Sequence, residues 1–231
     1  MLLSIDTCGS LGTVALARLD EARLDVPLAL LAQTEIPGKT WSAQLIPAVR
    51  SLLATHHVAL AEIATIVVTN GPGSFTGIRI GLSTAKGLAE PTSVPLLAVS
   101  RLAVLAHKAQ GLNSQIQAAA LDASRSEVYF GDFSAPVSSE KLLPRDAFLA
   151  LVATLGQNLA LCEPSLHAVA PSATRVDSPT AFDALQFALP RLHTRDFDDP
   201  LLLDGNYIRR SDAEIFSAPG APPRPQTTPR S

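Results

Sequence analysis

A pattern that occurs twice is the feature that most constrains the fold of this chain: an apolar strand ending in aspartate, a polar turn, and a second strand. The first copy is Leu2–Asp6 followed by Thr13–Leu19. The second copy is Ala118–Asp122 followed by Glu127–Phe133. The two aspartates lie 116 residues apart in a chain of 231 residues. Repetition at half the chain length predicts an α/β protein built from two similar lobes.

Hydrophobic periodicity predicts the elements around these repeats. We expect strands at 63–69 and 94–99, and helices at 40–55, 76–89, 102–108, 146–155, 182–189 and 204–216. Pro47 lies inside the first of these helices and predicts a late start or a kink, because proline cannot donate a backbone hydrogen bond. We place the two lobes at residues 1–108 and 109–216. The proline-rich residues 217–231 are predicted to be a disordered tail.

Composition narrows the classes of function. Hydrophobic residues make up 47% of the chain, the net charge is −3 and the pI is near 5.9. Nucleic-acid binding depends on cations that neutralise phosphates, and this chain has no excess of them, so a partner is expected to hold any RNA. Two cysteines are too few for a disulfide scaffold, and no apolar run is long enough to span a membrane. We therefore expect a cytoplasmic protein.

The glycine-rich segment 70–89 is the most informative part of the chain. Gly71 and Gly73 stand where a strand turns into a helix, and free backbone N–H groups at such a helix start can bind an anion. A tight turn without a ligand explains the same glycines. The segment lacks the Lys-Ser/Thr pair of a phosphate-binding P-loop, the third glycine of the dinucleotide fingerprint, and the flanking glycines of a nucleophile elbow around Ser74.

One face of the helix in this segment has almost no side chains. Gly77, Gly81 and Ala85 recur every four residues, although an interior glycine costs about 1 kcal/mol against alanine. A bare face lets another backbone approach closely. If the helix packs inside its own lobe, this is ordinary architecture, and if the face is exposed, it is an interface. The residues alone leave both interpretations open.

The five histidines do not form a metal site. They are His56, His57, His107, His167 and His193, and none stand at the spacing of a His-x-x-x-His or His-Glu-x-x-His pair. We expect no metal ion in this chain and no metallopeptidase activity.

Several segments together resemble the TsaB family, also called YeaZ. They occur in the order and at the spacing of that family, and the 71–79 run is the most specific. The match covers residues 1–133 well and 204–215 weakly, and residues 134–203 match no pattern. The matching segments are Ser4–Thr7, Ser42–Pro47, Gly71–Ala89, Asp122–Tyr129 and Tyr207–Arg209.

The resemblance implies an actin-like (ASKHA) fold of two duplicated ribonuclease-H-like lobes. It also implies a non-catalytic scaffold subunit, which is not an enzyme alone. Such a subunit forms a heterodimer with the catalytic paralogue TsaD and supports the binding of the ATPase TsaE. The complex transfers threonylcarbamoyl to adenosine 37 of tRNA. Self-association into a homodimer is a further implication. No cofactor is implied for this chain itself, whereas the complex uses ATP and Mg²⁺.

Site residues follow from the same resemblance. The two glycine- and apolar-rich helices are implied to contact TsaD. An alignment on the Gly-Pro-Gly run places the two metal-binding histidines of TsaD at Arg101 and Leu105, which cannot replace them. The predicted partner interface comprises Trp41, Leu45, Val49, Gly77, Ile78, Gly81, Leu82 and Ala85.

Two other functions remain alternatives. Actin-like proteins bind the phosphate of a nucleotide at the turn after the first strand. An autonomous ATPase or kinase would therefore contact phosphate through the candidate residues Asp6, Thr7, Gly71 and Gly73. Asp6 and Thr7 also suit a turn that binds nearby backbone N–H groups. A peptidase is disfavoured, because the chain has neither a histidine metal pair nor a nucleophile elbow.

Overall fold

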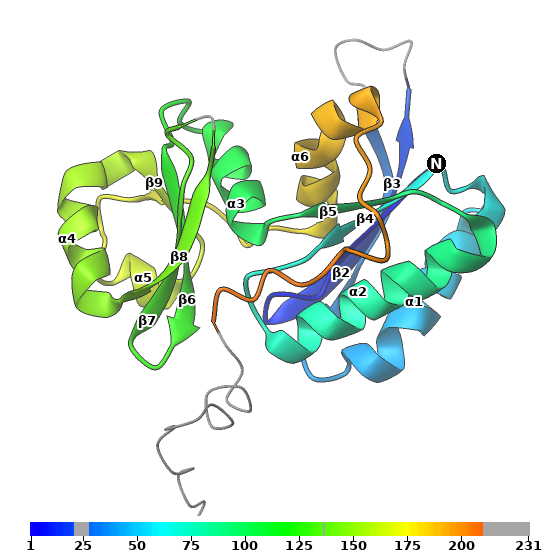
Figure 1. The fold of residues 1–231 in the computed structure, drawn as a ribbon, viewed down its shortest axis with the longest axis horizontal. Coiled ribbons are helices and arrows are strands. Elements are labelled where there is room, and N and C mark those ends of the chain that lie inside the picture. Colours follow the sequence, from blue (N-terminus) through cyan, green and yellow to red (C-terminus); the bar gives the residue numbers. More distant parts are fainter. Residues whose placement is uncertain (21–27, 136, 210–231) are drawn as a thin grey trace, which may run out of the picture.

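The computed structural model describes residues 1–20, 28–135 and 137–209, and these form two lobes (Figure 1). Each lobe is built on one five-stranded sheet, with the strand order β3-β2-β1-β4-β5 in the first and β10-β9-β6-β7-β8 in the second. Read in reverse, the second order repeats the first. In both sheets the first three strands along the chain pair antiparallel to one another. The last two strands then continue the sheet parallel to the first strand, β1 or β6. This confirms the predicted α/β fold of two ribonuclease-H-like lobes.

The described residues of the first half form five strands and three α-helices. They are β1 Leu2–Asp6, β2 Leu11–Leu19, β3 Leu28–Pro37, α1 Trp41–Thr55, β4 Thr65–Thr69, α2 Phe75–Ala89, β5 Leu96–Val99 and α3 Arg101–Gln110. The helix α1 begins six residues before Pro47, so the predicted late start is wrong. Pro47 and Ala43 are both exposed, so water can satisfy the Ala43 carbonyl that loses its partner.

The second half follows the same order, and most of its elements, though not β6 and α6, are shorter than their counterparts. They are β6 Ala118–Ser124, β7 Glu127–Asp132, β8 Ser139–Pro144, α4 Arg145–Leu155, β9 Leu159–Leu161, α5 Pro164–His167, β10 Thr174–Arg175 and α6 Ala181–Thr194. Both strand–Asp–turn–strand units are antiparallel hairpins, as predicted. The counterpart of the 15-residue α2 is α5, which has only 4 residues.

Two helix layers sandwich the first sheet (Figure 1). On one face, α1 and α2 pack side by side on alternate residues of the strands, such as Leu3, Ile5 and Val14. On the other face, α6 packs on the intervening residues, such as Leu2 and Ala15. Because successive side chains of a strand point to opposite faces, these apolar strands can bury both faces.

The third helix of each half crosses to the sheet of the other half. Leu102 and Leu105 of α3 pack on β6 and β7 of the second sheet, whereas Ala184 and Leu185 of α6 pack on the first sheet. A boundary drawn at residue 108 separates the sheets but does not describe this packing. The apolar faces of α3 and α6 match strands that are distant in sequence, which periodicity alone cannot detect.

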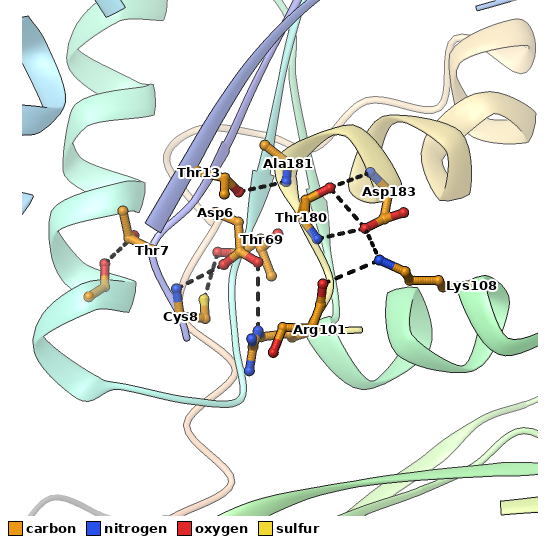
Figure 2. Close-up of polar contacts among 12 residues, drawn as sticks. Asp6, Thr7, Cys8, Thr13, Thr69, Arg101, Lys108, Thr180, Ala181 and Asp183 are labelled. Atoms are coloured by element: carbon orange, nitrogen blue, oxygen red, sulfur yellow. Dashed lines mark hydrogen bonds and ion pairs between the residues drawn. The ribbon is translucent and has the colours of Figure 1, made fainter. Parts of the chain in front are cut away.

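Polar contacts fix the start of α6 against the first half (Figure 2). The backbone N–H of Ala181 donates to Thr13 Oγ1 on β2 at 2.7 Å. Lys108 of α3 forms an ion pair with Asp183 at 2.9 Å, and Asp183 also accepts from the Thr180 N-cap at 2.8 Å. The helices α3 and α6, each of which packs on the sheet of the other half, are therefore joined to each other where the lobes meet.

After α6 the chain runs back along α2 toward the second lobe (Figure 1). We call residues 203–209 the strap. Asn206 N–H donates to the Asn70 carbonyl at 2.7 Å, and Lys86 Nζ donates to the Leu203 carbonyl at 2.7 Å. The predicted helix at 204–216 is wrong over 204–209, because these backbone groups bond to other segments. Residues 210–216 and the predicted tail at 217–231 lie outside the described residues.

Within the described part of the chain, no helix combines the length and the apolar character needed to cross a membrane.

Candidate functional site

We call residues 70–74, between β4 and α2, the glycine loop. The turn after β1 packs directly on this loop and on the start of α3 (Figure 2). Asp6 is 2% exposed, and its Oδ1 accepts the N–H of Cys8 at 2.8 Å. Its Oδ2 lies 3.6 Å from Nε of Arg101, which is itself 5% exposed. The first aspartate of the repeat is therefore part of a buried ion pair.

Burial governs the protonation of this cluster. Burial raises the pKa of the Asp6 carboxyl, and the Arg101 charge opposes that rise. Burial, the largest single influence, would lower the pKa of Arg101, but the combined charges of the surrounding acidic groups, Asp6 foremost, raise it, so the guanidinium stays charged. Burial and then the Asp6 charge raise the pKa of the Cys8 thiol well above its ordinary value, and this neutral thiol donates to the Thr69 carbonyl at 3.2 Å.

The candidate phosphate contacts are mostly used inside the fold. Thr7 is fully buried and donates its hydroxyl to the Gly77 carbonyl at 2.6 Å. Gly71 has φ of +115° and lies against Ile78 and the Asn206 carbonyl, so it needs the freedom of glycine. A Cβ on Gly73 would overlap the Cys8 carbonyl. The geometry thus favours the tight-turn interpretation over a phosphate site at Asp6, Thr7 and Gly71.

A cleft of about 330 Å³ separates the two hairpin turns. Gly73, Ser74 and Arg101 line it from the first lobe, and Asp122 and Glu163 line it from the second. Ser74 is the N-cap of α2, because its Oγ accepts the Gly77 N–H at 3.2 Å. This hydroxyl is a helix cap, which agrees with the rejection of a nucleophile elbow.

The second aspartate of the repeat has a different environment from the first. Asp122 is half-buried and accepts from the Ser165 hydroxyl at 2.6 Å and from the Ser124 N–H at 2.7 Å. Its own backbone N–H donates to Glu163 at 2.6 Å, and burial raises the pKa of Glu163. No cation replaces Arg101 on this side of the cleft among the contacts of the described residues.

The predicted partner interface is wrong, because all eight of its residues are buried in the first lobe. The bare face of α2 lies on the end of β1. A Cβ on Gly77 would overlap the Thr7 carbonyl, and one on Gly81 would lie 2.5 Å from Thr7 Oγ1. The glycines therefore permit close packing within the lobe. The eight residues are Trp41, Leu45, Val49, Gly77, Ile78, Gly81, Leu82 and Ala85.

The same two helices present a second set of residues to solvent, which we call the α1–α2 face. Its members share a helical repeat of three or four residues on the side opposite the sheet, and most are small or apolar. Ile46 is 38% exposed, and a Cβ on Gly87 would meet no atom within 4 Å. The face comprises Ala43, Ile46, Pro47, Arg50 and Ala54 on α1, and Thr76, Ile80, Ser83 and Gly87 on α2.

A groove of about 730 Å³ lies at one end of this face, between the starts of the two helices. Lys39, Ser42, Thr76 and Ile80 are among the residues that line it. This outward set was not among the predicted site residues, although Thr76, Ile80, Ser83 and Gly87 follow the 4-3-4 spacing typical of helix–helix contacts.

The residues aligned with the metal ligands of TsaD lie in the core. Arg101 is paired with Asp6, and Leu105 is fully buried. Among residues 1–20, 28–135 and 137–209, no three His, Cys, Asp or Glu side chains gather where they could hold a metal ion. That the chain has no metal of its own stays a prediction.

Comparison with known proteins gives three concordant similarities. A family model described as TsaD, tRNA N6-adenosine threonylcarbamoyltransferase, matches residues 33–186. The tRNA threonylcarbamoyladenosine biosynthesis protein TsaB of Escherichia coli strain K12 is 35% identical over 103 residues, 44% of this chain and 45% of that protein. TsaB of Bacillus subtilis strain 168 is 37% identical over 130 residues, 56% of this chain and 53% of that protein.

A solved structure extends the similarity over most of the fold. YeaZ from Pseudomonas aeruginosa superposes with a TM-score of 0.67 at 28% identity, covering 88% of this chain and 98% of that chain. The sequence matches span about half the length of the curated relatives.

Two lobes of this topology, meeting at a cleft below a glycine loop, define a two-lobed actin-like protein. The chain belongs to the TsaD family that the model describes and, within it, to the TsaB (YeaZ) branch. The curated relatives of that branch carry names that place them in the biosynthesis of threonylcarbamoyladenosine in tRNA.

Proposed function

We propose that this chain is a non-catalytic scaffold subunit in the formation of threonylcarbamoyladenosine at adenosine 37 of tRNA. In this proposal it forms a heterodimer with the catalytic subunit TsaD, the pair binds TsaE, and the chain contacts tRNA only through its partners. The complex uses ATP and Mg²⁺, and the chain itself uses no cofactor.

The observation that carries the proposal is the α1–α2 face. Two rows of mostly small or apolar residues lie on the side of these helices opposite the sheet, and all their members are exposed except the half-buried Ile80. They are Ala43, Ile46, Pro47, Arg50 and Ala54 on α1, and Thr76, Ile80, Ser83 and Gly87 on α2. Glycine in an exposed helix position costs about 1 kcal/mol, and a Cβ on Gly87 would meet no atom of the described residues within 4 Å. A partner whose helices lie close to these rows would offset that cost. The predicted contact with TsaD is thus moved to the outward face of the same helices.

The non-catalytic part of the proposal is supported by the cluster around Asp6. Arg101 stands at the position that aligns with a metal-binding histidine of TsaD, and it neutralises a buried carboxylate. The hydroxyls of Thr7 and Ser74 are used in internal hydrogen bonds, as a strand–helix contact and a helix cap. These groups stabilise the fold, which leaves them poorly suited to bind a nucleotide or attack a substrate.

A reconstituted transfer assay tests the function. The chain, TsaD of the same organism, or both are mixed with TsaE, ATP, Mg²⁺, threonylcarbamoyl-adenylate and tRNA, and modified adenosine is quantified. We expect no product from the chain without TsaD, and more product from TsaD when the chain is present. Product from the chain without TsaD would refute the non-catalytic role. An unchanged yield when the chain is added to TsaD would refute the scaffold role.

A calorimetric titration of the isolated chain with ATP and Mg²⁺ tests the nucleotide-binding alternative separately. We expect no heat of binding, because Asp6, Thr7 and Gly71 are closed within the fold. Saturable heat that disappears in an Asp6→Asn variant that is still folded would revive an autonomous ATPase or kinase.

A further inference from the structure

The part of the chain that contains α1 and α2 is basic, although the whole protein is acidic. Residues 36–89 include Lys39, Arg50, Arg79 and Lys86 but only one acidic residue, Glu62. The full chain has a net charge of −3. The acidic excess of the protein therefore lies outside residues 36–89. Glu35 and Glu90 flank this segment, and Glu35 lines a groove together with Pro47 at the edge of the α1–α2 face.

Three of the four basic side chains border that face. Lys39 lines the groove between the helix starts, and Arg50 belongs to the outward row of α1. Arg79 is exposed and adjoins Ile80 in the outward row of α2. Lys86 is not part of this basic border, because its Nζ is turned toward the strap and donates to the Leu203 carbonyl.

Arg79 is held in place before any partner arrives. Its guanidinium carbon lies 3.8 Å from the centroid of the Phe75 ring, and Phe75 contacts Tyr207 of the strap with a centroid separation of 5.0 Å. A cation over an aromatic face is attracted by the ring, and this restricts the rotamers of the long side chain. An ordered arginine loses less entropy when it forms an ion pair with another protein.

Two of these basic side chains lack an acidic partner within the described part of the chain. Among the residues that the structure describes, neither Arg50 nor Arg79 forms an ion pair with a carboxylate. Covering the α1–α2 face would remove water from around these charges. An unpaired buried charge is costly, so whatever covers the face must supply carboxylates or leave the charges at a wet rim.

We propose that the protein that covers the α1–α2 face presents carboxylates to Arg50 and Arg79, and that this charge selects it over a second copy of the chain. The inference rests on the proposed function, since it describes the TsaD surface that would meet this face. A two-fold homodimer through the same face would bring the same patch of both copies together, and with it Arg50 and Arg79 of each copy. Like charges in such a contact oppose association.

Salt dependence of the two associations tests this charge selection. The dissociation constant for TsaD of the same organism is measured by calorimetry between about 50 mM and about 500 mM salt, and self-association of the chain is measured by light scattering over the same range. We expect binding to TsaD to weaken by about tenfold and any self-association to strengthen, because salt screens both attraction and repulsion. Salt-independent binding to TsaD would overturn the inference.

Reversing the charges of Arg50 and Arg79 tests whether these two residues cause the salt-dependent binding to TsaD. In an Arg50→Glu, Arg79→Glu double variant we expect binding to TsaD to weaken by at least about tenfold and the salt dependence to decrease. The matched control is Lys141→Glu with Arg175→Glu, which reverses two exposed basic residues of the second lobe and should change binding by less than about twofold. Near-normal binding by the double variant would overturn the inference.

The outcomes separate this inference from the proposed function. If no complex with TsaD forms at any salt concentration, the proposed function fails and the inference fails with it. If a tight complex forms but neither salt nor charge reversal affects it, the scaffold role stands and only the charge selection is overturned.

Discussion

The two lobes share one topology but differ in the helix that follows the fourth strand. In the first lobe this helix is α2, with 15 residues, and it lies beside the equally long α1. In the second lobe it is α5, with 4 residues, beside the shorter α4. Among residues 1–20, 28–135 and 137–209, only the first lobe thus offers two long adjacent helices whose outer rows are mostly small or apolar. A duplicated fold can therefore use one copy for docking and the other for support.

The hairpin aspartates show the same division between lobes. Asp6 is 2% exposed and faces a buried arginine, whereas Asp122 is half-buried and bonds to a serine hydroxyl and to backbone. The first lobe therefore has a buried polar centre beneath α2. The second lobe keeps its aspartate at the open side of the cleft.

The largest expected effect is on the inner face of α2, where Gly77→Ala should destabilise the protein by about 4 kcal/mol. The added methyl would overlap the Thr7 carbonyl, so the backbone of α2 or β1 must move. Chemical denaturation monitored by circular dichroism measures the change. A loss below about 1 kcal/mol would mean that α2 does not pack on β1 as described.

The paired aspartates give the next contrast. Asp6→Asn should cost about 3 kcal/mol, because it leaves the Arg101 charge buried without its counter-ion. Asp122→Asn should cost no more than about 1 kcal/mol, since its partners can still bond to an amide oxygen or to water. Equal losses in the two variants would contradict the division between a closed and an open aspartate.

The rate at which each cysteine is alkylated, followed as a function of pH, compares the two lobes. Burial raises the pKa of Cys162 in the second lobe to about 11, and raises that of Cys8 in the first lobe well above its ordinary value. In a Cys8→Ser variant, the thiolate of Cys162 at pH 8 should be about a hundredfold scarcer than in an ordinary thiol, and alkylation by iodoacetamide should rise about tenfold per pH unit toward pH 10. In a Cys162→Ser variant, the fully buried Cys8 should react more slowly still. Fast labelling of Cys8 would show that the first lobe opens.

The smallest effect is expected on the outer face of α2. Gly87→Ala should stabilise the isolated chain by up to about 1 kcal/mol, because an added methyl meets no atom within 4 Å and alanine favours the helix. The same substitution at Gly77 thus has the opposite sign. Destabilisation by Gly87→Ala, measured in the same denaturation experiment, would show that this position is not free in the monomer.

Periodicity predicted most elements of the first lobe but not which side of a helix meets the sheet. Both sides of α2 consist of small and apolar residues, so the Gly77–Gly81–Ala85 row was assigned to a partner although it packs on β1. The exposed row at Ile80 and Gly87 has the same helical spacing. Only the three-dimensional packing of α2 against β1 distinguishes the two rows.

The second lobe was harder to predict because several of its elements are short. β9 has 3 residues, β10 has 2 and α5 has 4, which is too few for a period to be recognised. The strap was predicted as a helix, but its backbone pairs with Asn70 and its Leu203 carbonyl with Lys86. Such contacts join segments more than a hundred residues apart, and no local pattern encodes them.

Binding of TsaD to a matched pair of tryptophan variants tests the central claim most directly. Gly87→Trp fills the outward row of α2, and Ala150→Trp places the same side chain at an exposed position of α4 in the second lobe. Both variants should remain folded. We predict that the dissociation constant measured by calorimetry rises by at least about a hundredfold for Gly87→Trp and by less than about twofold for Ala150→Trp. Unchanged binding by a folded Gly87→Trp variant would contradict docking through the α1–α2 face.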